Sequence, residues 1–253
     1  MTRRLDGTVA LVTGASSGIG QATAVELARE GASLALVGQR ADRLTDLAAQ
    51  ITAAGGKALA LPTDVTDASA VAEAVERTAE ELGRLDILVN NAGVMLLGPT
   101  PGADLNDWRR MVDVNLTGLM HTTHAAIPHL LKAANDGPRQ VADIVNISSL
   151  NGRTAFAMSA VYSATKFGVN GFTEALRQEL TRQHVRVAVV EPGSVDTELR
   201  AQNSPAVQQM IAAGLGDIER LQSQDIADAI GYIVTRPRHV TVNELLVRPT
   251  EQA

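Results

Sequence analysis

Short apolar segments alternate with segments of helical periodicity along the whole 253-residue chain, and this alternation is the strongest constraint on its fold. The apolar segments carry no polar alternation, which is typical of strands buried on both faces. Strict alternation of strands and helices predicts an α/β fold, a doubly wound, seven-stranded parallel sheet with helices on both faces. The expected strands are residues 9–12, 34–37, 58–61, 85–89, 142–147, 185–190 and 244–247, and the expected helices are residues 19–29, 43–54, 67–82, 107–134, 160–183 and 224–234.

The amino-acid composition fits this architecture. Apolar residues make up 45% of the chain and aromatic residues 2%, so the core must consist mostly of Ala, Val, Leu and Ile. No linker, repeat or low-complexity segment interrupts the alternation, so residues 1–253 are expected to form a single domain. The exception is an irregular segment that follows the carboxyl end of an expected strand, where ligands bind in such sheets. We therefore predict a substrate lid at about residues 196–221.

Charge and cysteine content exclude several classes of function. The formal net charge is −6 and no cluster of Lys and Arg stands out, so nucleic-acid binding through a basic surface is not expected. The chain contains no cysteine, which excludes disulfides and thiolate metal sites. The apolar run at residues 9–12 is too short for a signal peptide or a membrane span, so a cytoplasmic protein without membrane attachment is expected.

No metal site is expected among the histidines. His121 and His124 lie three residues apart on an expected helix and could bind zinc together. No carboxylate or third ligand lies near them in helical register, since Pro128 displaces His129. Packing between helices is therefore the preferred interpretation of these histidines.

A glycine-rich segment follows the first expected strand. Residues 13–20 read Thr-Gly-Ala-Ser-Ser-Gly-Ile-Gly and lead directly into an expected helix. Glycines let the backbone approach a pyrophosphate, and the free N–H groups at the start of the helix can bind the anion. The spacing Gly-x-x-x-Gly-x-Gly is weak on its own, but a strand before it and a helix after it favour a nucleotide-binding loop.

Tyr162 and Lys166 lie four residues apart in an expected helix, so their side chains share one face. A nearby ammonium stabilises a phenolate and thereby lowers the pKa of the phenol. A tyrosine of this kind can exchange a proton with a carbonyl or alcohol oxygen near neutral pH. The pair alone is not specific, because many helices carry one on a solvated face.

Several features together resemble the short-chain dehydrogenase/reductase family. They are the loop at residues 13–20, Asn90-Asn-Ala-Gly93 after the fourth expected strand, Asn115, Ser149 ahead of the Tyr162/Lys166 pair, and Glu191-Pro-Gly-Ser-Val-Asp-Thr197. The resemblance implies a Rossmann fold and an NAD(P)-dependent enzyme that transfers a hydride between the nicotinamide and a carbonyl or carbinol carbon. Residues 242–249 also resemble the tail of a subgroup that includes clavulanate-type aldehyde reductases and 3-hydroxy acid (serine-type) dehydrogenases.

The family pattern assigns roles to four polar side chains. Tyr162 is the expected general acid in reduction and the base in oxidation, and Lys166 is expected to lower its pKa and bind the nicotinamide ribose. Ser149 is expected to hydrogen-bond the substrate oxygen, while Ser148 faces the other way if the strand continues. Asn115 is expected to hold a water in a proton relay that reaches Lys166.

The resemblance also places residues around the cofactor and the substrate. The glycine-rich loop is expected at the pyrophosphate, Asp64 and Val65 at the adenine, and Val195 and Thr197 at the nicotinamide carboxamide. The expected cofactor contacts are Gly14, Ser16, Ser17, Gly18, Ile19, Gly20, Gln39, Arg40, Asp64, Val65, Asn91, Ala92, Gly93, Tyr162, Lys166, Pro192, Gly193, Val195 and Thr197. The expected substrate contacts are Leu150, Asn151, Phe156, Met158 and Met210.

The end of the second expected strand bears on the choice between NAD and NADP. The family places an acidic residue there when it binds the ribose hydroxyls of NAD, and that acid repels a 2′-phosphate. This chain has Gly38 instead, and Arg40 could pair with a 2′-phosphate or simply face water. Gln39 and Ser17 depart from the basic residues that many NADP-preferring members carry at these positions. NADP(H) is favoured, and NAD(H) remains possible.

The sequence therefore predicts an NADP(H)-dependent oxidoreductase that acts on a small ketone or aldehyde, or on a secondary alcohol. The alternatives are an NAD-dependent alcohol dehydrogenase of the same family and a non-catalytic cofactor-binding sensor or scaffold. The intact polar residues at positions 115, 149, 162 and 166 argue against the sensor. The resemblance also implies a homodimer or homotetramer that pairs the helices expected at residues 107–134 and 160–183.

Overall fold

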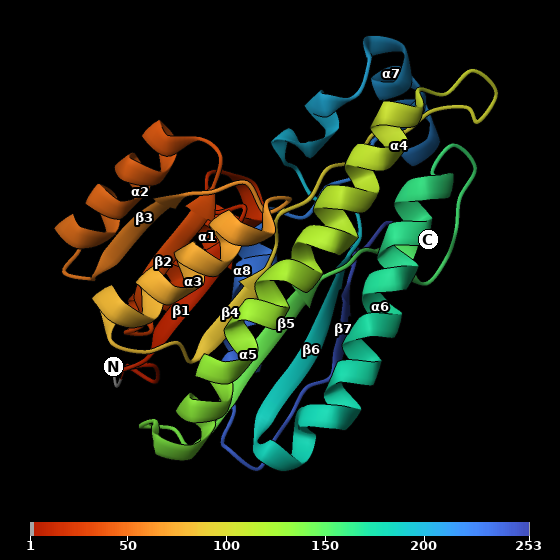
Figure 1. Cartoon of the computed structure of the whole chain (residues 1–253). Helices are drawn as coiled ribbons and strands as arrows, with labels where there is room; N and C mark the ends of the chain where they lie inside the picture. Colours follow the sequence, from red (N-terminus) through yellow and green to blue (C-terminus); the bar gives the residue numbers. More distant parts are fainter. Residues whose placement is uncertain (1–2, 253) are drawn as a thin grey trace.

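A seven-stranded parallel sheet forms the centre of the protein (Figure 1). The computed structural model describes residues 3–252, apart from the side chains of residues 214 and 215. The strand order is β3-β2-β1-β4-β5-β6-β7. The strands β2 and β3 are added on one side of β1 and the strands β4 to β7 on the other, so the strand order reverses between the neighbours β1 and β4. The strands are β1 (Val9–Thr13), β2 (Ser33–Gly38), β3 (Ala58–Pro62), β4 (Ile87–Asn90), β5 (Ala142–Ile147), β6 (Val185–Pro192) and β7 (Glu244–Val247).

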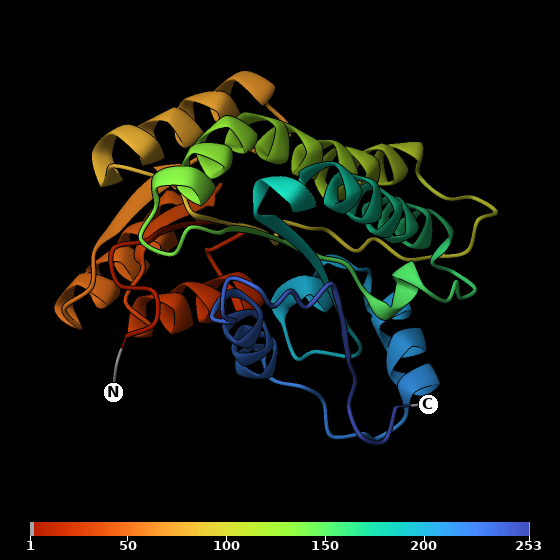
Figure 2. The ribbon, with the colours of Figure 1, turned by 90° about the horizontal axis from the view of Figure 1, so that it is seen from below.

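Helices cover both faces of the sheet, and Figure 2 shows the layers with the sheet between them. One face carries α1 (Gly18–Arg29), α2 (Ala41–Ala53) and α8 (Ser223–Val234), whose buried side chains form one hydrophobic core with the sheet. The opposite face carries α3 (Ala68–Leu82), α5 (Gly118–Asp136) and α6 (Ala160–Leu180), which form the second core. The prediction of a doubly wound α/β fold is thus confirmed.

The two cores explain why the strands are apolar at every position. Successive side chains of a strand point to opposite faces of the sheet. In β1, Ala10 and Val12 belong to the core beneath α1, whereas Leu11 belongs to the core beneath α3 and α5. Each strand therefore buries both faces, and the seven expected strands agree with the observed ones to within two residues at each end.

The helix expected at residues 107–134 is interrupted in the structure. It consists of α4 (Leu105–Val112), one π-helical turn (Asp113–Thr117) and α5. The sequence predicts a bend or an early end at Pro128, but Pro128 lies within α5 and the helix continues past it. His124, four residues before Pro128, is exposed, so water can solvate the carbonyl that the proline leaves without an N–H donor. The interruption instead falls around Asn115, and such π-helical turns occur frequently at functional sites.

Residues 196–221, the predicted lid, contain more regular structure than the sequence indicates. A 3₁₀ turn (Glu198–Gln202) precedes α7 (Pro205–Leu215), and α7 lies at the end of the molecule where α6 begins (Figures 1 and 2). Ser204 accepts a hydrogen bond from Val207 N, and this cap starts the helix with Pro205 at its first position. Val195 pairs with Leu221 in a short parallel bridge, so the two ends of the segment meet.

Among the described residues, no helix combines the length and the hydropathy that crossing a bilayer requires.

Candidate active site

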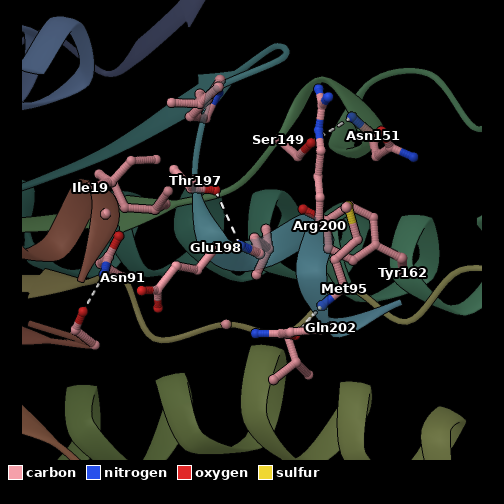
Figure 3. Close-up of a pocket in the computed structure, with 18 of the residues that line it drawn as sticks. Ile19, Asn91, Met95, Ser149, Asn151, Tyr162, Thr197, Glu198, Arg200 and Gln202 are labelled. Atoms are coloured by element: carbon pink, nitrogen blue, oxygen red, sulfur yellow. Dashed lines mark hydrogen bonds between the residues drawn. The ribbon is translucent and has the colours of Figure 1, made fainter. Parts of the chain in front are cut away.

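A large cavity lies at the carboxyl ends of β1, β4, β5 and β6. Its volume is about 1300 Å³, and its wall includes residues from the loops that follow all four strands. In doubly wound sheets, ligands bind at this edge, next to the point where the strand order reverses. Figure 3 shows Ile19 and Asn91 on one side of the cavity, Ser149 and Tyr162 on the other, and Glu198 between them.

The glycine-rich loop between β1 and α1 forms one wall of the cavity. Gly14 and Gly18 have φ angles of 65° and 56°, a left-handed conformation that suits glycine. A side chain on Gly14 would also lie 2.9 Å from Cα of Ala92, so nothing larger fits there. Gly20 departs from its expected role, because it does not line the cavity. A Cβ on Gly20 would instead collide with the backbone oxygen of Gly14, so this glycine lets α1 pack against the loop.

A polar junction joins the glycine-rich loop to the end of β4. The backbone N–H groups of Asn91 and Ala92 donate to Thr13 Oγ1 at 2.9 and 3.0 Å. Asn91 Nδ2 returns a hydrogen bond to Thr13 O at 2.9 Å. Asn91, Ala92 and Gly93 all line the cavity, as expected, and these bonds fix their position relative to the loop.

Ser149, Tyr162 and Lys166 meet at one end of the cavity, and we call this group the tyrosine end. All three side chains are buried, with exposed fractions of 9%, 6% and 6%. The Tyr162 hydroxyl hydrogen-bonds Ser149, and Lys166 Nζ donates to Ile147 O at 2.8 Å. The ammonium lies 5.8 Å from the centroid of the Tyr162 ring. Ser148 Oγ donates to Lys166 O instead, although β5 ends at Ile147 and the strand alternation does not extend to Ser148.

Burial governs the proton affinities at the tyrosine end. It raises the pKa of Tyr162 above the ordinary value of 10.0, and the hydrogen bond from Ser149 offsets this only in part. Burial also lowers the pKa of Lys166 from 10.5 to about 8. The sequence predicts a lowered pKa for Tyr162, whereas the structure gives a raised one. The reason is that burial disfavours the charged phenolate, and this cost is larger than the opposing effect of Ser149.

Asn115 lies behind the cavity wall, and its expected role in a proton relay stays a prediction. It is buried at the π-helical turn but does not line the cavity. Its Oδ1 accepts from Val94 N at 2.8 Å, and its Nδ2 donates to Val94 O at 2.9 Å and to Thr165 Oγ1 at 3.3 Å. Through these bonds Asn115 ties the loop after β4 to α6, close to Tyr162 in sequence.

Five charged and hydroxyl side chains meet at the opposite end of the cavity: Ser16, Ser17, Arg40, Arg43 and Glu198. We call this group the arginine end. Arg40 donates through Nε to Ser16 Oγ at 3.1 Å and through Nη2 to Ser17 Oγ at 2.5 Å. Glu198 accepts from Arg40 Nη1 at 2.8 Å and from Arg43 Nη1 at 2.7 Å. The two guanidinium groups hold the pKa of Glu198 well below its ordinary range, at about 2.

Two members of the arginine end are missing from the sequence interpretation. Arg43 lies three residues after Arg40, one turn along α2, so helical spacing could have found it. Glu198 lies far away in the sequence, in the predicted lid, and no local pattern points to it. The expected Gln39 lines the cavity beside them.

The remaining predicted cofactor contacts also line the cavity. Asp64 follows β3, and Thr66 donates to its carboxylate from both the backbone N–H and the hydroxyl. Thr197 accepts from Leu199 N at 3.4 Å and thereby begins the 3₁₀ turn of the lid. The others in the wall are Gly18, Ile19, Val65, Pro192, Gly193 and Val195.

All five predicted substrate contacts lie in the cavity wall near the tyrosine end or in the lid. Leu150 and Asn151 follow Ser149, and Asn151 N donates to Ser149 Oγ at 3.1 Å. Phe156 and Met210 are about half exposed. Met158 has a φ of 68°, an uncommon conformation for a residue other than glycine, and its carbonyl accepts from Gly98 N.

Sequence reasoning also missed the polar support behind the site. Asn90 on β4 and Asn146 on β5 face each other in register, with Asn90 Nδ2 donating to Asn146 Oδ1 at 2.9 Å. The same Nδ2 donates to Thr123 on α5, and Asn146 Nδ2 donates to Thr173 on α6. This series of hydrogen bonds connects the strands β4 and β5 to the helices α5 and α6 that cover them. Isolated Asn and Thr residues inside apolar segments were the only signal.

The predicted lid adds further side chains to the wall. Arg200 donates to Ser194 Oγ and lines the cavity, and burial lowers its pKa together with the nearby charge of Arg220. The backbone of the loop after β4 is bonded to the lid by Asn203, which accepts from Leu97 N and donates to Met95 O. Figure 3 shows Arg200, Gln202 and Met95 in this region.

In the part of the chain that the structure describes, no group of three or more His, Asp or Glu side chains converges as a metal site would require. His121 Nδ1 instead lies 3.3 Å from Val65 O, and His129 Nε2 lies 3.1 Å from Glu76 on α3.

Comparisons with known proteins agree with this geometry. Residues 8–208 match the family described as short chain dehydrogenase. The chain is 38% identical over 241 residues to an uncharacterised oxidoreductase of Staphylococcus aureus (strain MRSA252). The matched region covers 95% of this chain and 96% of that protein. The resemblance of residues 242–249 to one subgroup stays a prediction.

Two solved structures share the fold over their full lengths. A short chain dehydrogenase from Burkholderia cenocepacia J2315, in complex with NADP, has a TM-score of 0.85 and 32% identity, over 99% of this chain and 100% of that one. A metagenomic short-chain oxidoreductase in complex with NADP has a TM-score of 0.81 and 33% identity, over 98% and 99%. The chain therefore belongs to the short-chain dehydrogenase family of NAD(P)-dependent oxidoreductases.

Proposed function

We propose that the protein is an NADP(H)-dependent oxidoreductase that interconverts a small ketone or aldehyde and the corresponding alcohol. The observation that carries the proposal is the construction of the cavity. One wall holds a glycine-rich loop and two arginines, and the other holds a buried Tyr162 hydrogen-bonded to Ser149. A dinucleotide and a carbonyl substrate need these two kinds of site within reach of each other.

The residues present fit a dinucleotide. The absence of a side chain on Gly14 lets the loop pack closely on Asn91 and Ala92, and the loop presents its backbone at the start of α1. In this position Gly14, Ser16 and Ile19 would hold the pyrophosphate, while Val195 and Thr197 would contact the nicotinamide. The bound nicotinamide supplies or accepts the hydride, and the protein supplies the proton transfer.

Tyr162 acts as the general acid in reduction and as the base in oxidation. Because its pKa is raised, the phenol is protonated at neutral pH and can donate to a developing alkoxide. Ser149 orients the substrate oxygen toward this proton. Lys166 Nζ donates to the Ile147 carbonyl, and from this position it would contact the ribose of the dinucleotide. Its positive charge would stabilise the phenolate that forms when Tyr162 donates its proton. Asn115 positions the loop after β4 and joins α6 near Lys166, where a water-mediated relay would end.

The arginine end favours NADP(H) over NAD(H). Position 38 carries no carboxylate that would bind the ribose hydroxyls, and two guanidinium groups lie where a 2′-phosphate would be placed after β2. The two NADP complexes among the related structures support the same choice. An NAD-dependent alcohol dehydrogenase is the second candidate, and the two half-exposed arginines argue against it.

The test is a screen of initial rates with aldehydes, ketones and hydroxy acids, run with NADPH and NADH and with the oxidised cofactors. We expect turnover of at least one carbonyl compound, with kcat/KM at least tenfold higher for NADPH than for NADH. A higher value for NADH would make the protein an NAD-dependent enzyme. Cofactor binding without turnover of any substrate would favour the sensor or scaffold.

We further propose a homodimer or homotetramer formed through α4, α5 and α6. These helices expose the large apolar side chains Val112, Met120 and Phe167, with exposed fractions of 39%, 37% and 46%. Exposed apolar side chains gathered on neighbouring helices commonly mark interfaces. Sedimentation velocity should give a dimer or tetramer, and Phe167→Asp should shift it toward the monomer. A monomeric wild-type protein at micromolar concentration would contradict this arrangement.

A further inference from the structure

Glu198 places a carboxylate between two arginines at the arginine end of the cavity. Its two oxygens accept from Arg40 Nη1 at 2.8 Å and from Arg43 Nη1 at 2.7 Å. All three side chains are about half exposed, and all three line the cavity. A carboxylate that bridges two guanidinium groups uses the same donors that would bind a phosphate.

The donors around Glu198 form a set that suits a dianion. Arg40 leaves β2, Arg43 follows one turn later on α2, and Ser16 and Ser17 belong to the glycine-rich loop. Arg40 donates hydrogen bonds to both serine hydroxyls, and these bonds hold its guanidinium in the position from which Nη1 donates to Glu198. Two guanidinium groups thus converge on the Glu198 carboxylate, and the two serine hydroxyls hold one of them in place.

Glu198 belongs to the lid rather than to the cofactor loop. It opens the 3₁₀ turn that Thr197 begins, and the turn leads into α7. The far side of this turn is bonded through Asn203 to Met95 and Leu97. The ion pairs of Glu198 therefore connect this segment to the start of α2, at the end of the cavity where the adenosine part of a dinucleotide would lie.

We infer that Glu198 is a built-in competitor for the 2′-phosphate of NADP(H), and that it sets how strongly the protein prefers NADP(H) over NAD(H). The inference rests on the proposed function, in which this cavity binds a nicotinamide dinucleotide. A 2′-phosphate must displace the Glu198 carboxylate from Arg40 and Arg43 before it can pair with them. A dinucleotide with a free 2′-hydroxyl can bind while these ion pairs stay intact.

The size of the effect follows from the exposure of the groups. Half-exposed ion pairs are screened by water and salt and contribute little individually. Displacing Glu198 should therefore reduce the affinity for a 2′-phosphate about threefold to tenfold, since two such pairs are lost. The reduction should diminish at high ionic strength, where the ion pairs weaken.

The experiment measures Kd by calorimetry for two probes, adenosine 2′,5′-bisphosphate and 5′-AMP, which differ only in the 2′-phosphate. Glu198→Gln removes the charge while keeping the shape, and it should tighten the bisphosphate about threefold to tenfold and change 5′-AMP less than twofold. Asp217→Asn is the matched control, because it removes the same charge from an exposed position in the same lid. It should change both probes less than twofold.

A second background separates competition at the arginines from the general charge of the lid. When Arg40 and Arg43 are both replaced by Gln, Glu198→Gln should no longer improve binding of the bisphosphate. If it still does, or if Glu198→Gln strengthens both probes equally or weakens the bisphosphate, the inference is wrong.

The outcome for the proposed function can be read separately. A wild-type protein that binds NADH more tightly than NADPH would overturn the proposed cofactor. In that case, a selective gain in bisphosphate affinity in Glu198→Gln would still support the competition between Glu198 and a 2′-phosphate. If this gain is absent, the competition is overturned too.

Discussion

The tyrosine end and the arginine end of the cavity are built from different kinds of contact. At the tyrosine end, Ser149, Tyr162 and Lys166 are buried, and their partners lie on β5 and α6 or just beyond them. At the arginine end, Arg43 and Glu198 are about half exposed, and they come from segments 155 residues apart. Buried hydrogen bonds are costly to break, whereas exposed ion pairs exchange readily with water and ligands.

This difference divides the work between the two ends. A rigid, desolvated end can hold a proton donor in a fixed position and shift its pKa, which acid–base chemistry requires. An exposed, charged end can trade an internal carboxylate for a phosphate, which selects among cofactors. The comparison predicts that changes at the tyrosine end alter turnover, and that changes at the arginine end alter cofactor choice.

The largest effect is expected from Tyr162→Phe, which removes the proposed proton donor and keeps the ring. Turnover should fall about 10²- to 10⁴-fold, while the Kd for NADPH should change less than threefold. Initial rates and fluorescence titration of NADPH check the two parts. Tyr232→Phe, at the other of the two tyrosines, is the control, because Tyr232 is exposed on α8 and packs on Arg236. Equal activity in both variants would break the assignment of catalysis to the tyrosine end.

The next effect tests how much the polar network behind the site stabilises the folded protein. Asn146→Ala leaves the buried Asn90 Nδ2 with one fewer acceptor and Thr173 without its amide donor. We expect the free energy of unfolding to fall by roughly 2 kcal/mol, because buried polar groups lose their partners. Urea denaturation measures the change, and Asn135→Ala, exposed on α5, should stay within about 0.5 kcal/mol of wild type. A similar loss of unfolding free energy in both variants would mean that the network stabilises the fold no more than an exposed polar side chain does.

A comparable effect should appear in the pH dependence of stability. The pKa of Lys166 is lowered to about 8 in the native state, so the native protein releases this proton before the unfolded chain does. Between about pH 8 and 10.5 the unfolded state binds more protons, and stability from this group rises with pH. Relative to Lys166→Met, wild type should gain roughly 1–3 kcal/mol in free energy of unfolding between about pH 7.5 and 9.5.

Measurements should stop below the ordinary pKa of tyrosine, because the raised pKa of Tyr162 acts in the opposite direction. The native phenol keeps its proton longer than the unfolded one, so its contribution falls as pH rises above 10.0. Parallel curves for wild type and Lys166→Met over the lower range would show that the Lys166 ammonium is not desolvated.

The smallest effect is expected at the exposed end. Arg40→Gln should weaken NADPH about fivefold to tenfold and leave NADH within twofold, because only the 2′-phosphate loses a partner. The value of kcat should stay within about twofold, since Arg40 lies away from Tyr162. Arg182→Gln, exposed beyond the end of α6, is the control and should change neither constant. A large loss of kcat in Arg40→Gln would contradict the claim that the arginine end affects cofactor choice and not turnover.

Most of the fold could be predicted from the sequence, since it depends on local patterns. The alternation of apolar strands with helices fixes the class, and Asp67 caps α3 as its position suggests. The π-helical turn at residues 113–117 could not be predicted, because it depends on packing of the Asn115 side chain against Val94 and Thr165. The helix α7 was missed, although Ser204-Pro205 is a helix start signal and Val207, Met210 and Ile211 have helical spacing.

The candidate site divides in the same way. Tyr162, Lys166 and Ser149 could be predicted because helical spacing and a strand end bring them together. Gly20 was assigned to the cofactor, although its backbone packing against Gly14 is what demands a glycine. Glu198 could not be predicted, because only the folded lid carries it to Arg40 and Arg43.

Transfer of deuterium from NADPH that carries deuterium at both C4 positions tests the central claim most directly. With a carbonyl substrate from the screen, wild type and Tyr232→Phe should place one deuterium on the carbinol carbon for each NADPH oxidised, as measured by mass spectrometry. Tyr162→Phe should bind NADPH with nearly unchanged Kd and give almost no labelled alcohol. Labelled alcohol from Tyr162→Phe at the wild-type rate, or no labelled product from wild type with any carbonyl that it consumes, would contradict the account.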